Sequence, residues 1–237
     1  MTPQDMDRIL AQAANRSVPP DLDSAAIERA KASLPSLLGP VRPIGSTWVL
    51  VSLFVAVSAA VALCGALGFG IRGLPVLSVA RRAIIFPVVL AGAWIAAVAS
   101  VREMKPAGGT RTGAVALAIG GLAPLAAFAL LFQDYDSQNF VPEGVRCLLA
   151  GLVCALPAAL LIFLLLRRGF ILDYRAAGLA TGTLAGLTGL GMLELHCPIL
   201  KAPHIMLWHV AVVWISAIGG WLVGWIAQTR RNQRERS

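Results

Sequence analysis

Long apolar stretches alternate with short polar segments along this chain, and the polar segments hold most of the charged residues. Each apolar stretch approaches the roughly 20 residues that a helix needs to cross the hydrocarbon core of a bilayer. We therefore predict an all-α, polytopic membrane protein with six transmembrane helices. The expected helices cover residues 47–69, 83–101, 114–132, 147–166, 176–195 and 206–227, which together form a transmembrane domain over 47–227.

The first 46 residues differ from the rest because they are polar, mixed in charge and interrupted by prolines. They do not have the pattern of a signal peptide, so we expect this tail to stay on the side of the membrane where it is made. Met6, Ile9 and Leu10 recur at helical spacing, and Ile27 lies in a second short helical pattern. Two such helices cannot bury a core alone. The tail therefore either lies disordered or along a surface, or folds when it binds a partner.

The placement of basic residues indicates the orientation in the membrane. Only 14% of residues are charged, against about a quarter in soluble domains, and the formal net charge is +8. With six spans both termini share a side, and that side holds 15 of the 20 lysines and arginines. The positive-inside rule then puts both tails, including the basic residues 228–237, in the cytoplasm. The basic excess thus reports topology, and we expect no direct contact with nucleic acid.

The segment 191–209, between the fifth and sixth spans, holds most of the residues that could carry chemistry. In this orientation it faces outward. Its nitrogen, sulfur and oxygen donors could bind zinc, copper or another soft metal ion. The candidate ligands are Glu194, His196, Cys197, His204 and His209. Their spacing matches no zinc-finger or zincin signature, so the histidines could instead sense pH, tune the Cys197 thiol or bond to a carbonyl.

Two cysteines are expected at the same depth on the outer face. Cys147 begins the fourth span at its outer end, and Cys197 follows the fifth span at its outer end. In an oxidising compartment the two thiols could form a disulfide, or they could offer a thiolate pair to a soft metal. The alternative is two unpaired, partly buried cysteines. For Cys64 and Cys154 we favour a role in packing.

Several classes of function lack support in the sequence. There is no Walker loop, GxSxG motif or dinucleotide fingerprint, and no acid pair lies within a span, so we expect no enzyme. The span centres are nearly free of ionisable residues, which argues against an ion-coupled transporter. Gly178, Gly182 and Gly186 recur every four residues. Such spacing predicts close packing between helices of one chain, with a homo-oligomer as the alternative.

The order of several short motifs resembles the NrsF-type membrane anti-sigma factors, which restrain extracytoplasmic-function (ECF) sigma factors. The matching pieces are LLGPVRP at 37–43, RCL at 146–148, LRRG at 166–169, the AGL repeats at 177–179 and 185–187, and LHCP at 195–198. The resemblance implies a bacterial inner-membrane protein whose tail sequesters a sigma factor. It also implies that Cys147 and Cys197 take part in signal perception. His204 and the Trp208–His209 pair depart from the pattern, in which an aromatic residue usually occupies the place of His209. The segment after Gly169 also departs, because it lacks a proline-containing turn.

The first hypothesis is therefore a non-enzymatic anti-sigma factor. Its tail, through Met6, Ile9, Leu10 and Ile27, would hold an ECF sigma factor at the membrane. Oxidation of the two thiols, or metal bound near Cys197, would release it in a stress response. The second hypothesis is a small transporter or channel for a metal or solute, with the cysteine and histidine segment as its entry site. The third is a membrane redox enzyme, for which a second dithiol and cofactor ligands are missing.

Overall fold

The computed structural model describes residues 46–104, 112–136, 139–167, 169 and 171–234. The tail residues Met6, Ile9, Leu10 and Ile27, which the sequence singled out for partner binding, lie outside the described residues.

Every regular element in the described ranges is a helix, and six of the helices are long and apolar enough to cross a membrane. The prediction of an all-α protein with six transmembrane helices is therefore confirmed. The elements are α3 (Thr47–Phe69), α4 (Gly73–Val76), α5 (Val79–Arg102), α6 (Thr112–Leu131), α7 (Phe140–Leu166), α8 (Tyr174–His196), α9 (Ala202–His204), η1 (Ile205–His209) and α10 (Val210–Arg234).

Local chemistry explains where several helices begin. The Ser78 hydroxyl accepts a hydrogen bond from the Arg81 N–H at 3.3 Å and caps α5. The Asp173 carboxylate accepts from the Ala176 N–H at 3.2 Å and caps α8 in the same way. Helix α7 begins at Phe140, ahead of the start expected at residue 147. Pro142, which suits a first helical turn, lies in this added segment.

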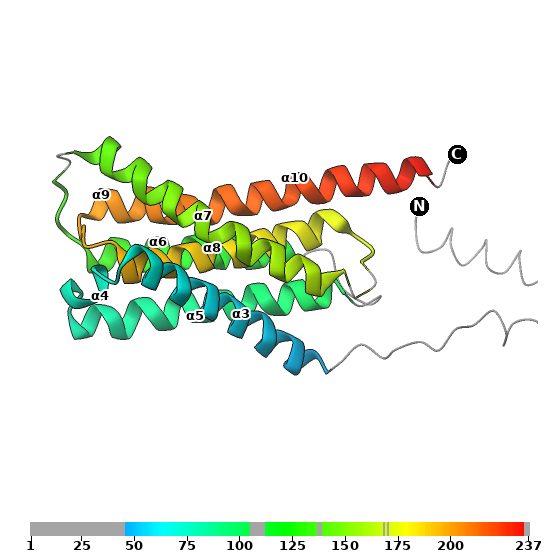
Figure 1. Ribbon diagram of the computed structural model, residues 1–237, viewed down its shortest axis with the longest axis horizontal. Coiled ribbons are helices and arrows are strands. Elements are labelled where there is room, and N and C mark those ends of the chain that lie inside the picture. The colour runs from blue at the N-terminus through cyan, green and yellow to red at the C-terminus, as the bar shows by residue number, and fades with distance from the viewer. Residues whose placement is uncertain (1–45, 105–111, 137–138, 168, 170, 235–237) are drawn as a thin grey trace, which may run out of the picture. The chain divides into compact units, whose positions relative to one another are not determined.

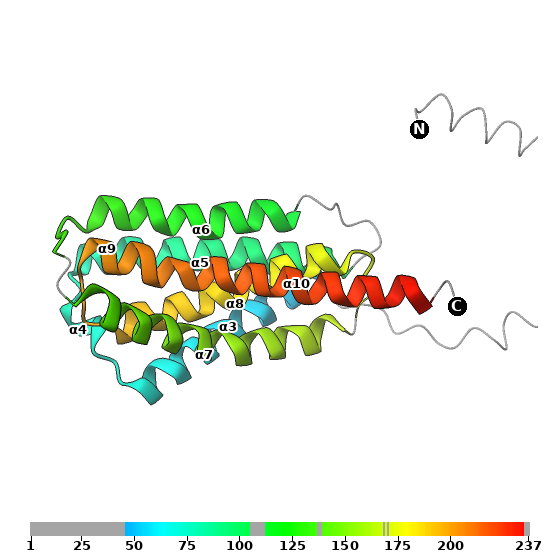
Figure 2. The same ribbon diagram turned by 90° about the horizontal axis from the view of Figure 1, so that it is seen from above.

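Helix α8 is the central helix of the bundle. Of its most apolar stretch 83% is buried, whereas the other five spans are 22–50% buried. Figures 1 and 2 show α8 in the middle of the bundle from two directions, with α6 on one side and α7 on the other. Helix α8 packs against α3, α5, α6, α7 and α10.

Glycines let α8 and α10 pack backbone to backbone. A Cβ added to Gly178 would meet the Gly220 carbonyl oxygen, and one added to Gly186 would lie 2.5 Å from the Val213 Cα. In lipid, such close approach replaces the hydrophobic effect as the source of helix association. The glycine repeat thus serves packing within one chain.

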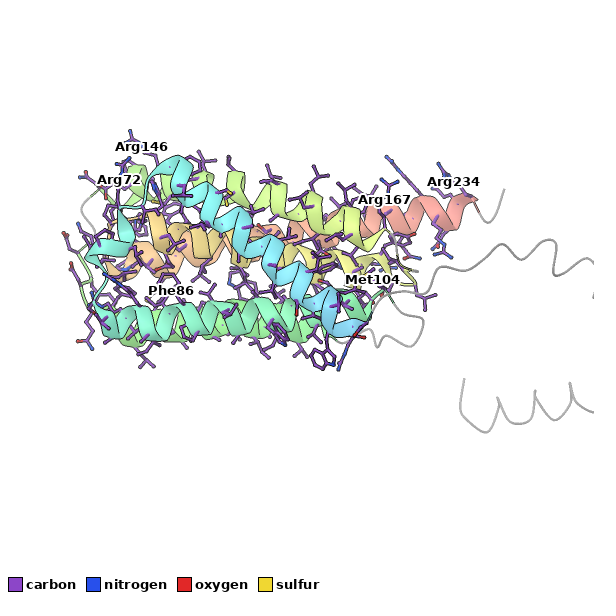
Figure 3. The ribbon with its side chains drawn as sticks, turned by 60° about the horizontal axis from the view of Figure 1, so that its bottom comes forward. Arg72, Phe86, Met104, Arg146, Arg167 and Arg234 are labelled. Carbon is purple, nitrogen blue, oxygen red and sulfur yellow. The ribbon has the colours of Figure 1, made fainter. Side chains whose placement is uncertain are left out.

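The two ends of the bundle differ in what they carry. Helices α4 and α9 lie at one end, and α3 begins and α10 finishes at the other (Figure 1). Figure 3 shows Arg72 and Arg146 at the first end, and Met104, Arg167 and Arg234 towards the second. We call the end with α4 and α9 the α9 end. There the Lys201 ammonium bonds the Asp136 carboxylate at 2.7 Å, and the Ala202 N–H donates to the Asp134 carbonyl at 2.7 Å.

Candidate functional site

Three segments of the chain meet at the α9 end and bring sulfur and nitrogen donors together. Cys147 lies near the start of α7, and Cys197 follows the last residue of α8. The Cys197 N–H donates to the Leu193 carbonyl at 2.7 Å, which fixes the thiol against the helix terminus. His204 ends α9 and His209 ends η1. The four side chains converge although 62 positions separate Cys147 from His209 in the sequence.

The two thiols lie side by side. Cys147 Sγ is 3.4 Å from Cys197 Sγ, and both cysteines are free. Cys147 is partly exposed, whereas Cys197 is only 3% exposed. The hydrogen-bonded Cys147 thiol and burial raise the pKa of Cys197.

The two histidines complete the group. His204 Nε2 lies 3.6 Å from Cys197 Sγ, and the His204 and His209 ring centroids are 5.3 Å apart. His209 Nδ1 lies 2.7 Å from Glu194 Oε1, and both side chains are almost fully buried. Because a carboxylate accepts hydrogen bonds, Nδ1 of His209 donates to Glu194, and in the neutral ring Nε2 then carries the lone pair.

One donor atom from each of Cys147, Cys197, His204 and His209 lies within 4.8 Å of the other three. Two cysteine sulfurs and two histidine nitrogens are a ligand set that zinc prefers in proteins. His209 Nε2 and His204 Nδ1 are buried and have no hydrogen-bond partner. Buried polar atoms of this kind are rare in proteins and call for an explanation. The residues present therefore fit a metal ion.

The π-helix η1 gives the two histidines a shared direction. In an α-helix, residues five apart point about 140° away from each other. A π-helix bonds residue i to residue i+5, and its wider turn brings residues five apart closer to one face than an α-helix does. His204 caps the start of η1, and His209 is its last residue. The extra residue in this turn thus aims both rings at the thiols.

Comparison with protein families decides the class of the molecule. The model of the NrsF family, described as negative regulator of sigma F, matches residues 34–227. The chain belongs to the NrsF family. No curated protein and no solved structure gives a significant match. The family confirms the resemblance seen in the sequence and makes negative regulation of a sigma factor the class of function.

In this NrsF-family protein the sequence-derived donors separate into two groups. Cys197, His204 and His209 lie in the cluster with Cys147, and Glu194 contacts the cluster through His209. His196 is elsewhere: its Nδ1 lies 2.7 Å from the Gly70 carbonyl oxygen. Its ring also packs on Phe69, with centroids 5.7 Å apart. His196 thus joins the end of α3 to the end of α8.

Two glycines support the cluster, and sequence analysis did not single them out. A Cβ on Gly73 would lie 2.6 Å from the Cys197 carbonyl oxygen, so only glycine lets α4 pack on this backbone. A Cβ on Gly144 would meet the indole of Trp208, which also packs on Phe140 at 5.5 Å between centroids. Glycines are common in membrane helices, so no sequence signal separates these from the others.

Proposed function

We propose that this protein is a membrane-bound anti-sigma factor that holds an ECF sigma factor through residues 1–46. A thiol-redox or soft-metal signal at Cys147 and Cys197 releases the sigma factor. The observation that carries the proposal is the contact between these two thiols, 3.4 Å apart, in a chain that belongs to a family of sigma-factor regulators. Thiols so close respond to oxidants by forming a disulfide and to soft metals by sharing the ion.

Packing supplies a route from the thiols to the tail. Cys147 belongs to α7 and Cys197 follows α8, so any new bond between their sulfurs shifts one helix against the other. Both helices contact α3: a Cβ on Gly65 would lie 2.9 Å from Cys154 Sγ and 3.1 Å from Met192 Cγ. Helix α3 begins at Thr47, directly after the tail. A shift of α7 or α8 therefore reaches the segment proposed to hold the sigma factor.

The orientation follows from the charge distribution. In the sequence, 15 of the 20 lysines and arginines lie on the side of the two tails, and the positive-inside rule assigns that side to the cytoplasm. The α9 end then faces the periplasmic side of a bacterial inner membrane. In the proposed orientation the thiols face the oxidising compartment and the tail faces the cytoplasm.

Co-purification of the full chain with a host sigma factor tests the proposal. The full chain, solubilised from host membranes in mild detergent, should capture an ECF sigma factor that mass spectrometry identifies. A variant that lacks residues 1–46 should lose it, as should the triple variant Met6→Asp, Ile9→Asp and Leu10→Asp. Arg230→Gln, an exposed change in the opposite tail, should retain it. Equal capture by the shortened chain would show that the tail does not hold the sigma factor.

A transcription reporter driven by that sigma factor tests the signal. Cys147→Ser and Cys197→Ser should each leave the reporter silent when an oxidant or a soft metal is added, because neither single thiol can form the bond. Cys64→Ser should respond like the native protein, since Cys64 is exposed on α3 away from the pair. Normal induction in both Cys147→Ser and Cys197→Ser would remove the thiols from the mechanism.

A further inference from the structure

We propose that Cys147, Cys197, His204 and His209 form a four-coordinate site for a thiophilic divalent cation of the zinc class. Glu194 holds His209 in the tautomer that binds the ion. The site deepens the proposed function and relies on it for its regulatory meaning, but cation binding itself is independent of any sigma factor.

The geometry is close to that of a tetrahedral site. Zinc bond lengths of about 2.3 Å to sulfur and about 2.0 Å to nitrogen put neighbouring donors about 3.3–3.8 Å apart. The two sulfurs are 3.4 Å apart, and Cys197 Sγ lies 3.6 Å from His204 Nε2. All four donor atoms lie within 4.8 Å of one another. Small side-chain movements therefore suffice to close the site around an ion.

Buried ring nitrogens of the two histidines support the binding of a cation at this site. His209 Nε2 has no hydrogen-bond partner, although the residue is only 1% exposed. His204 Nδ1 also has none, and that residue is 2% exposed. A packing role does not account for His209 Nε2 left unpaired in the protein interior. Coordination to a cation gives His209 Nε2 a partner. His204 Nε2 and the two sulfurs then bind the same cation.

The Glu194–His209 pair has the form of a carboxylate–histidine–metal triad. Histidines that bind metals commonly donate the other ring N–H to a carboxylate, which fixes the ring and increases its basicity. Here Glu194 Oε1 lies 2.7 Å from His209 Nδ1, and both groups are buried. Burying an acid and a base together is costly unless further bonds compensate. A cation on the opposite nitrogen supplies that compensation.

The ligands determine the kind of site. All four positions come from the protein, so no coordination position is left open for a substrate, as is typical of structural or regulatory zinc sites. The ligands belong to α7, the end of α8 and the α9–η1 segment. A bound cation therefore joins these three segments. The same two sulfurs cannot bind the cation and form a disulfide with each other, so the two states of the site exclude one another.

Titration with Co²⁺ tests the site, because tetrahedral cobalt with thiolate ligands has intense visible bands and a charge-transfer band in the near ultraviolet. The full-length protein in detergent is reduced, treated with a chelator and freed of small molecules before titration. We expect one Co²⁺ per chain with these bands, and loss of the bands when one equivalent of Zn²⁺ is added. Absence of the bands from reduced, folded protein would overturn the proposal.

Matched variants assign the ligands. Cys147→Ser, Cys197→Ser, His204→Gln and His209→Gln should each weaken Co²⁺ binding at least tenfold or abolish the tetrahedral spectrum. His196→Gln and Cys154→Ser, which change a nearby histidine and another cysteine of α7, should keep both affinity and spectrum. Circular dichroism and gel filtration identify any variant that does not fold. Unchanged spectra in folded His204→Gln and His209→Gln, or equal loss in His196→Gln, would refute the ligand set.

The outcome is separable from that of the proposed function. If the chain binds Co²⁺ as expected but captures no sigma factor, the metal site stands and the anti-sigma proposal fails. If the chain captures the sigma factor but shows no cobalt bands, the reverse holds.

Discussion

Glu194 Oε1 lies 2.7 Å from His209 Nδ1, in a pair of side chains that are 2% and 1% exposed. The two residues belong to the last turn of α8 and the end of η1, so the bond ties the central helix to the segment that leads into α10. It also leaves His209 Nε2 directed towards the thiols. The bond thus contributes both to the stability of the α9 end and to the geometry of the candidate metal site.

Replacing Glu194 separates these two roles. Glu194→Ala should lower the free energy of unfolding by about 3 kcal/mol, because it leaves a buried histidine without its partner. Glu194→Gln keeps an acceptor for Nδ1–H and should cost less, yet it should weaken Co²⁺ binding by about 10–100-fold, as outer-sphere changes do. Denaturant unfolding in detergent and cobalt titration give the two quantities. Native cobalt affinity in Glu194→Gln would exclude an outer-sphere role for the carboxylate.

Oxidation and metal binding should compete. Hydrogen peroxide converts the two thiols to one disulfide, accepts their two electrons and two protons, and leaves as two waters. Oxidised protein should therefore bind no Co²⁺, and zinc-loaded protein should oxidise more slowly than the metal-free form. The double variant Cys64→Ser and Cys154→Ser restricts the reaction to Cys147 and Cys197. Mass spectrometry of peptides measures the fraction of protein that carries the Cys147–Cys197 disulfide. Full cobalt binding by the disulfide form would contradict the proposal that the cation and the disulfide use the same two sulfurs.

Two adjacent glycines of α10 offer a sharp comparison. A Cβ on Gly220 would meet the Gly178 carbonyl oxygen of α8, whereas a Cβ on Gly219 has nothing within 4 Å. Gly220→Ala should destabilise the protein by about 1–3 kcal/mol, because the two backbones must move apart. Gly219→Ala should be neutral or stabilise by up to about 1 kcal/mol through its helix propensity. Equal unfolding free energies for the two variants would show that α8 and α10 are not in close contact.

Gly73 supports the site without taking part in its chemistry. Its Cβ would lie 2.6 Å from the Cys197 carbonyl oxygen and 2.9 Å from that of Glu194. Gly73→Ala should therefore displace the end of α8 and weaken Co²⁺ binding by about tenfold, with all ligands unchanged. Gly68→Ala is the control, since a Cβ there has no neighbour within 4 Å. If both variants bind cobalt like the native protein, α4 does not position Cys197.

The sequence predicts the six membrane-spanning helices well, because a helix in lipid needs about 20 mostly apolar residues in a row. Such stretches can be read directly from the sequence. The contact of Cys147 with Cys197 could also be anticipated, since both cysteines lie at the ends of spans that reach the same face. The sequence does not show which of the histidines lie near the two thiols. Residues 197–201 reverse the chain without a regular pattern, and this turn decides that His204 faces the thiols while His196 faces Gly70.

The role of Glu194 was also only partly visible. Its position in an apolar run marked it as a candidate ligand, but only the fold shows that it reaches the cluster through His209. The π-turn at Ile205–His209 has no sequence signature, and without it the spacing of His204 and His209 predicts opposite directions. Gly73 and Gly144 were missed because their importance depends on backbone approach from distant segments.

The π-turn makes the candidate metal site depend on helix winding as well as on ligand identity. Deleting Leu207, which is exposed, would let the segment return to regular α-helical winding with His204 and His209 four positions apart, a spacing that keeps both rings on one helix face. The shortened protein would keep both cysteines, both histidines and all six spans, and it should therefore keep a cobalt spectrum. Relatives of this chain could therefore carry the two histidines five positions apart on a π-turn or four apart on an α-turn, and a comparison of ligand spacing alone would not show that the two sites are equivalent.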